Sequence, residues 1–484
     1  MIRTVSEKSR KLIKQQFTAS SVDKIIAVIL IALTVGILGM VLILRPHTTP
    51  IGDETYLFLR QAKAQYTMED QLSFSGRIHS FNILPQIIRW LSLNGSVQVG
   101  IIANLLMIVL GALTTLTFFS IVKTLKRTRT IAFLATIIFV LSPAFTYLFV
   151  TVNKNAFPLL LLLISMDSML KENTRRANLA LIATAAFGII PAIVSLLSIA
   201  IYVLLKKEKK LWLAGVIIGT VIVIQMALAR TSHIIQDTPI RFVQTLQTML
   251  ADMGGIFGLN IFAIILAIFG FVYLWKEKYK HSIIYITIIV FSITSIFIKD
   301  TLFYLTPLIA ALAALGIEEI LKIRWEIRLI ENLTLLVLIT GLLFSSFSHV
   351  KALTVAQPTD EIKESLEFLK EQSNQSAVVF SDITKGNWIS AIAERKNVWD
   401  SNTELVRDIK ERNIDFKNLT ATRKIKEADK VIEKYGITHI WIDANMKKKL
   451  WKNEEDGLLF LLTYGKDFKK IYESENTQIL EIER

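Results

Sequence analysis

The 484-residue sequence contains no cysteine, and charged residues make up only 20% of it. Without cysteine, disulfide bonds, thiolate nucleophiles and cysteine-ligated zinc or iron–sulfur sites are excluded. With 52% hydrophobic residues and so few charges, a soluble enzyme, a fibrous protein and a disordered chain are excluded as well. Apolar runs long enough to cross a bilayer recur along the chain, which predicts a polytopic α-helical membrane protein.

Common signatures of soluble chemistry are missing too. No glycine-rich phosphate loop of the Walker kind is present, and the six histidines are dispersed rather than paired as metal ligands. Ionisable residues are scarce within the apolar runs, where a proton-coupled transporter more often carries them. Chemistry is therefore expected in the segments between the runs.

Basic residues predict which loops face the cytoplasm. The net charge of +14 reflects basic clusters in the tail 1–24 and in short loops, and such clusters mark the cytoplasmic side rather than a nucleic-acid site. The run 177–205 has a cluster on both sides and carries Gly188 and Pro191 near its middle, so we expect a hairpin of two half-length passages. About eleven passages result, with the amino terminus inside and the carboxyl terminus outside. The apolar runs are 25–44, 97–122, 130–150, 156–170, 177–205, 211–229, 254–275, 282–298, 302–321 and 330–349.

Composition divides the chain into three parts. A basic cytoplasmic tail (1–24) precedes a membrane domain over 25–350, which has two long outer loops at 45–96 and 230–253. Residues 351–484 are charged and mixed, which predicts a small soluble α/β domain outside the membrane. Its expected helices begin at Thr359 or Asp360 and cover 386–395, 403–412 and 425–435, and its expected strands are 377–380, 437–442, 469–473 and 478–483.

Two acidic residues, Asp53 and Glu54, stand just beyond the first apolar run. If a helix begins there, Asp53, Tyr56 and Arg60 share one face. A carboxylate beside an apolar interface can act as a general base, and the pair can also help to bind a divalent cation. The alternative is an ordinary pair of helix-terminal charges that favours the helix dipole.

The rest of the outer loops offers weaker candidates. Residues 83–91 carry the apolar spacing of a helix lying in the membrane interface, and His79 precedes it. The loop 230–253 contains Arg230, His233 and Arg241, which would suit a phosphate-bearing lipid or would serve as ordinary surface charges.

Residues 52–60 (Gly-Asp-Glu-Thr-Tyr-Leu-Phe-Leu-Arg) resemble the acidic segment that GT-C superfamily glycosyltransferases carry after their first span, in the oligosaccharyltransferase branch especially. The resemblance implies transfer of a sugar from a polyprenyl-phosphate-linked donor at the outer face of the membrane. Asp53 would then be the base that activates the acceptor, and Glu54 the second carboxylate. Arg60, Arg230, His233 and Arg241 are the candidates for the donor phosphate.

A second segment, 381–403, resembles the stretch that carries the WWDYG motif in oligosaccharyltransferases, and it matches at Gly386, Trp388 and Arg395. The resemblance implies that Trp388 contacts the acceptor. His79 is the second candidate for acceptor binding. The motif itself is absent, because Asp-Ile-Thr-Lys stands at 382–385, so a peptide acceptor is not specified.

Two further departures concern the metal and the donor. The loop 151–155 has no carboxylate where such enzymes often place a second acid, and Phe303 replaces an arginine in a motif near Pro307. A cofactor such as Mg²⁺ or Mn²⁺ is therefore left open.

The leading hypothesis is a membrane glycosyltransferase acting on a glycan, lipid or protein acceptor in the cell envelope. The alternative is a non-catalytic scaffold or transporter for envelope glycan or lipid assembly.

Overall fold

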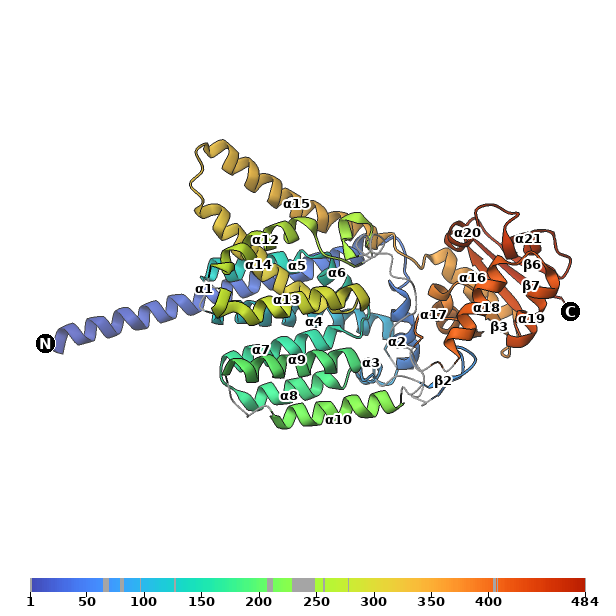
Figure 1. The fold of residues 1–484 in the computed structure, drawn as a ribbon, viewed down its shortest axis with the longest axis horizontal. Coiled ribbons are helices and arrows are strands. Elements are labelled where there is room, and N and C mark those ends of the chain that lie inside the picture. The colour runs from blue at the N-terminus through green and yellow to red at the C-terminus, as the bar shows by residue number, and fades with distance from the viewer. Residues whose placement is uncertain are drawn as a thin grey trace.

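The chain forms a helical bundle with a separate α/β domain at one end (Figure 1). In this computed structural model the first helix, α1 (Ile2–Leu44), enters the bundle from the end opposite the carboxyl-terminal domain (Figure 1). The structure describes residues 2–63, 69–78, 82–95, 97–125, 128–206, 212–228, 249–255, 257–276, 278–403, 406 and 408–483.

Among the described residues, four helices are long and apolar enough to cross a membrane. They are Ser21–Leu44 within α1, α4 (Val99–Thr124), α14 (Thr301–Lys322) and α15 (Arg328–Thr354). A bent pair, α5 (Arg129–Val140) and α6 (Pro143–Val150), forms a fifth candidate. The expected total of about eleven passages stays a prediction. The other bundle helices are α7 (Ala156–Leu170), α8 (Thr174–Ala185), α9 (Ile189–Lys206), α10 (Trp212–Leu228), α12 (Ile261–Trp275) and α13 (Lys278–Phe297).

Two breaks in the bundle have local causes. The run 130–150, expected as one helix, bends by 60° at Ser142. The Ser142 hydroxyl accepts a hydrogen bond from the backbone N–H of Phe145, and Pro143 starts the new helix. The expected break in 177–205 is found at Gly188, whose φ of +137° separates α8 from α9. The predicted break is therefore confirmed, with a helix of 12 residues before it and one of 18 after it, whereas the two half-length passages stay a prediction.

Helices α12 and α14 pack with their backbones in contact. A Cβ added at Gly316 would lie 2.0 Å from the carbonyl oxygen of Leu266, and one added at Gly270 would lie 2.0 Å from that of Leu312. Small residues permit this approach in membrane helices, where dispersion rather than the hydrophobic effect drives association. The two glycines fix the position of α14, which Asp300 immediately precedes.

The first outer loop is folded wherever it is described. It contains α2 (Asp53–Lys63), a ribbon of β1 (Glu69–Asp70) and β2 (Arg77–Ile78), and α3 (Leu84–Leu91). The strands are antiparallel. The expected helix at 83–91 is thus confirmed as α3, with Ile88 buried and Trp90 79% exposed.

The carboxyl-terminal domain is built on a five-stranded mixed sheet in the order β4-β3-β5-β7-β6. Strands β4, β3 and β5 are parallel, whereas β7 and β6 run antiparallel to their neighbours. The expected α/β organisation is confirmed within this domain. Its elements are α16 (Asp360–Gln372), β3 (Val378–Phe380), η3 (Ile383–Lys385), α17 (Gly386–Trp388), the π-helical turn η4 (Ile389–Ala393), β4 (Lys396–Asn397), α18 (Ile409–Ala421), α19 (Ile425–Tyr435), β5 (His439–Asp443), α20 (Ala444–Leu450), α21 (Gly457–Tyr464), β6 (Phe468–Glu473) and β7 (Thr477–Ile482).

Two expectations for this domain need correction. The helix expected at 403–412 begins only at Ile409, and ahead of it the side chain of Asp400 accepts from the N–H of Asn402 in a local turn. The helix expected at 386–395 is one short turn followed by η4, which stops at Glu394 in a left-handed conformation (φ +52°).

The first outer loop contributes side chains to both cores of this domain. Phe74 packs with Phe380 and Trp399 on one side of the sheet. Tyr56 packs with Trp388 on the other side. The first outer loop and the carboxyl-terminal domain therefore pack together as one unit at the end of the bundle.

We expect Gly316→Ala to destabilise the protein by about 1–3 kcal/mol, because the added methyl group overlaps a backbone carbonyl. Thermal unfolding of the purified protein in detergent measures this. Gly219→Ala is the matched control, since a Cβ there meets nothing within 4 Å. Equal unfolding temperatures for the two variants would contradict the close approach of α12 and α14.

Candidate active site

Asp53 lies where the membrane domain meets the carboxyl-terminal domain. Gly52, with a φ of +91°, turns the chain after Ile51, and Asp53 then opens α2. The Asp53 Oδ2 atom accepts a hydrogen bond from Nδ2 of Asn387 at 2.8 Å and another from the hydroxyl of Ser401. Both donors belong to the carboxyl-terminal domain, so this carboxylate joins the two parts of the protein.

The environment of Asp53 makes it a weak acid. Burial raises the pKa of Asp53 to about 7, although the hydrogen bonds from Ser401 and Asn387 act in the opposite direction. Its second oxygen, Oδ1, is buried without a hydrogen-bond partner in the described structure. A carboxyl group with a pKa near neutrality and one unengaged oxygen is suited to accept a proton.

Gly386 sets the position of Asn387. A Cβ at Gly386 would lie 2.1 Å from the carbonyl oxygen of Trp399 and 2.6 Å from Cβ of Asp400. Asn397 donates to the Gly386 carbonyl at 2.9 Å. Only glycine lets the chain pass so close to the 399–400 segment, which places Asn387 and Ser401 around the same oxygen of Asp53.

Asp400 anchors the first outer loop from the other side. It accepts from the hydroxyl of Ser73 at 2.7 Å and pairs with Nη1 of Arg77 at 3.3 Å. Burial raises the pKa of Asp400, and the Arg77 guanidinium counters that effect. These contacts tie the first outer loop to the segment that carries Ser401.

Trp388 packs between the first outer loop and Lys385. Its ring meets that of Tyr56 edge to face at a centroid distance of 6.5 Å, and the Lys385 ammonium lies 4.2 Å from a Trp388 ring centroid. Lys385 also pairs with Asp443 at 3.0 Å. The indole Nε1 of Trp388 is buried without a partner in the described structure. Trp388 thus contacts α2 through Tyr56, and the residue before it, Asn387, is the one that is hydrogen-bonded to Asp53.

Glu54 belongs to a different cluster from Asp53. Its carboxylate lies 3.3 Å from Nζ of Lys154, and the same Nζ lies 3.5 Å from Asp300. Sequence reasoning did not select Lys154 or Asp300, although both stand at the ends of apolar runs on the predicted outer side. Asn387 and Ser401 were also missed, because only the folded domain brings them to Asp53.

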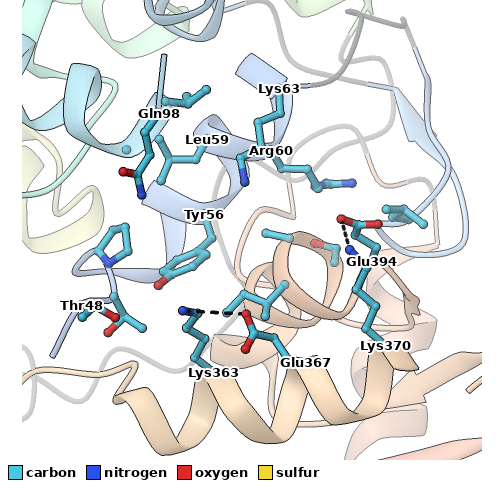
Figure 2. Close-up of a pocket in the computed structure, with 18 residues that line it drawn as sticks. Thr48, Tyr56, Leu59, Arg60, Lys63, Gln98, Lys363, Glu367, Lys370 and Glu394 are labelled. Carbon is cyan, nitrogen blue, oxygen red and sulfur yellow. Dashed lines mark ion pairs between the residues drawn. The ribbon is translucent and has the colours of Figure 1, made fainter. Parts of the chain in front are cut away.

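A cavity of about 720 Å³ lies on another side of α2 (Figure 2). It is lined by α2, the start of α4, α16 and η4, and Tyr56 and Arg60 are among its residues, whereas Asp53 is not. Figure 2 shows ion pairs on its α16 wall, Lys363 with Glu367 and Lys370 with Glu394.

Arg60 is the one candidate phosphate ligand that the structure describes. Its guanidinium pairs bidentately with Asp70, at 2.7 Å and 2.5 Å. The role of Arg60 in donor binding stays a prediction. The other candidates, Arg230, His233 and Arg241, and the acceptor candidate His79 lie outside the described residues.

The described side chains around Asp53 and Glu54 do not fit a divalent cation. No group of three acidic or histidine side chains that could hold a metal ion occurs in the part of the chain that the structure describes. Around Asp53 and Glu54, one carboxylate accepts from two neutral donors and the other faces an ammonium group. Mg²⁺ and Mn²⁺ need several oxygen ligands at close range and are repelled by such a cation.

Comparison with solved structures identifies the fold. No protein-family model and no curated protein matches the sequence. The oligosaccharyltransferase of Archaeoglobus fulgidus, solved with a tethered acceptor peptide, matches with a TM-score of 0.61 at 11% identity over 96% of this chain and 74% of its own. ArnT from Cupriavidus metallidurans, bound to undecaprenyl phosphate, gives a TM-score of 0.54 at 9% identity over 94% and 97%. Arabinofuranosyltransferase AftD from Mycobacteria gives 0.55 at 14% identity over 96% and 40%.

Other structures of similar proteins add bound groups. An Archaeoglobus fulgidus oligosaccharyltransferase was solved with an inhibitory peptide and a dolichol-phosphate, and one with Zn and sulfate. At such low identity, the likeness establishes the fold. The chain has the fold of GT-C membrane glycosyltransferases, which confirms the resemblance inferred from residues 52–60 at the level of architecture.

We expect Ser401→Ala to raise the pKa of Asp53 further above its ordinary value, because it removes a hydrogen bond that favours the ionised form. An infrared titration of the protonated carboxyl band measures the midpoint, and Asp53→Asn assigns the band. Ser376→Ala, at an exposed turn, serves as the control. A midpoint that falls in Ser401→Ala would show that this hydroxyl does not support the carboxylate.

Proposed function

We propose that this protein is an integral-membrane glycosyltransferase that uses Asp53 as general base. It moves a sugar from a polyprenyl-phosphate-linked donor to an acceptor at the outer face of the membrane. The observation that carries the proposal is the buried Asp53 carboxylate, with its pKa raised to about 7 and its Oδ1 atom unengaged. Support also comes from the fold, because two proteins that share it were solved with dolichol-phosphate and undecaprenyl phosphate.

The geometry supports a simple displacement at the sugar. Asp53 Oδ1 removes the proton from an acceptor hydroxyl, and that oxygen forms a bond to the anomeric carbon. The bond from the anomeric carbon to the phosphate oxygen breaks, and its electron pair leaves with the lipid phosphate. A phosphate departs as a stable anion, so the step needs a base and no separate general acid.

The carboxyl-terminal domain holds the base in position. Asn387 and Ser401 fix one oxygen of Asp53, so that the other keeps a constant direction. The buried Nε1 of Trp388 and Oδ1 of Asn387, both without partners in the described structure, lie in the same neighbourhood and offer a donor and an acceptor to an acceptor molecule. We therefore place the acceptor beside Trp388, as the sequence resemblance implies.

The second candidate function is a non-catalytic scaffold or a transporter for envelope assembly. The missing WWDYG motif and the absence of an acid in 151–155 favour it. Against it stands the cost of sealing an acidic side chain between two domains, which a scaffold does not need. An activity that depends on Asp53 distinguishes the two functions.

We expect Asp53→Asn to reduce sugar transfer by a factor on the order of 10²–10⁴, the usual contribution of a positioned base. Purified protein in nanodiscs is incubated with labelled polyprenyl-phosphate sugars and membrane extract, and labelled product is counted. Asp415→Asn, on α18, is the matched control. If no donor is used by the wild type, and Asp53→Asn also leaves the cell-envelope phenotype unchanged, the enzyme proposal fails and the scaffold or transport function replaces it.

The same variant should not lose stability. The side-chain oxygen of asparagine can still accept hydrogen bonds from Asn387 and Ser401, and the substitution removes a charge that is costly to bury. Because burial raises the folded-state pKa of Asp53 from 3.8 to about 7, this group's contribution to stability falls as pH rises through that window. Asp53→Asn should therefore raise the unfolding temperature more above pH 7 than near pH 4, as a thermal scan at both values would measure.

Transfer by the wild type should rise with pH through about 7, since the base must be ionised and burial sets its pKa there. Below that midpoint we expect kcat/KM to fall roughly tenfold per pH unit. A pH–rate profile measures this. A flat profile from mildly acid to mildly basic pH would exclude Asp53 as the titrating base.

A further inference from the structure

The position of Lys154 is fixed by hydrogen bonds within the loop that carries it. It lies between α6 and α7, in a short loop whose neighbours Asn153 and Asn155 are buried. Oδ1 of Asn153 accepts from the N–H of Asn155 at 2.9 Å, and Oδ1 of Asn155 accepts from the hydroxyl of Tyr304 on α14 at 3.1 Å.

The same loop is tied directly to α2. The N–H of Val152 donates to the hydroxyl of Thr55 at 3.1 Å, two residues away from Asp53. The loop thus carries Lys154 to the amino-terminal end of α2, where Glu54 lies. Lys154 Nζ ends 3.3 Å from Glu54 and 3.5 Å from Asp300, so one ammonium joins carboxylates from α2 and from the start of α14.

We propose that the Lys154 ammonium is the resident cation of this site and stands where a divalent cation would have to bind between Glu54 and Asp300. The two carboxylates alone supply the oxygen ligands that Mg²⁺ or Mn²⁺ prefers. An ammonium already between them compensates their charge and would repel a metal ion at the same place. This chain's own residues therefore make the site independent of a metal.

Burial strengthens this arrangement. The side chains of Lys154 and Glu54 are each 26% exposed and that of Asp300 is 25% exposed. Charges that are partly shielded from solvent in this way interact more strongly with one another than the charges of fully exposed ion pairs do. The ammonium also balances the negative charge beside Asp53, whose protonation both Glu54 and Asp400 favour.

That the site works without a metal in catalysis rests on the proposed function, whereas the metal-binding test below does not need any activity. Mn²⁺ is titrated into the full-length protein in nanodiscs, and free Mn²⁺ is followed by its paramagnetic resonance signal. We expect no stoichiometric binding by the wild type. We expect Lys154→Glu to raise the affinity for Mn²⁺ by roughly tenfold or more, because it removes the repelling charge and adds a carboxylate ligand.

A matched control exists at the other end of the bundle. Lys322 also lies between two carboxylates, 2.8 Å from Glu318 and 3.1 Å from Glu319, and all three are on α14. Lys322→Glu should gain much less Mn²⁺ affinity, because the side chain of Lys322 is 53% exposed, against 26% for Lys154, and water competes more strongly for a cation held by an exposed carboxylate. Equal gains in the two variants would overturn the proposal, since any added acid would then suffice.

Binding of Mn²⁺ by the wild type that is lost in Asp300→Asn would also overturn the proposal, and this arm does not require Lys154→Glu to fold. A second arm measures sugar transfer in the presence of a chelator, where we expect unchanged turnover. Loss of turnover that Mn²⁺ or Mg²⁺ restores would contradict a resident lysine. If no sugar is transferred at all, the proposed function fails, while the Mn²⁺ titration still decides the role of Lys154.

Discussion

One carboxylate, Asp53, is sealed between the membrane domain and the carboxyl-terminal domain, and the geometry of the site depends on keeping it there. Removing a carboxylate from water is costly unless it is hydrogen-bonded. The two donors that compensate Asp53, Asn387 and Ser401, both come from the other domain. The domain must therefore dock with hydrogen-bond accuracy, and Gly386 makes that possible because no Cβ fits against Trp399.

Docking of this accuracy needs more than two hydrogen bonds. The first outer loop places Phe74 in one core of the carboxyl-terminal domain and Tyr56 in the other. Just after α1, the guanidinium of Arg45 donates to the carbonyls of Ala356 and Pro358, both at 2.7 Å, and so ties the end of α1 to the linker before α16. Asp53 is therefore held by packing within the chain itself, which is the condition that the proposed proton transfer requires.

The sequence predicted those features that depend on local pattern. Apolar runs and caps located most bundle helices, the start of α16 at Thr359 and the helix at 425–435, because hydrophobic periodicity and N-caps act within a few residues. The helix expected at 403–412 begins only at Ile409, and the residues just before this range are engaged elsewhere, since buried Asp400 accepts from Ser73 of the first outer loop and from the N–H of Asn402. Asp53 could be proposed from its place in the chain, whereas Asn387 and Ser401 lie more than three hundred residues away and become neighbours only on folding.

Asp53 and Glu54 are adjacent in sequence, yet the fold gives them opposite surroundings. Successive helical residues point about 100° apart, so the two carboxylates leave the start of α2 in different directions. Asp53 faces neutral donors from the carboxyl-terminal domain, and burial raises its pKa towards neutrality. Glu54 faces an ammonium group held by the loop between α6 and α7. Pairs of acids whose environments separate their proton affinities divide roles in enzymes. Here the different surroundings of Asp53 and Glu54 follow from which part of the protein each side chain meets, and the proposed site therefore lies at the junction of the two domains.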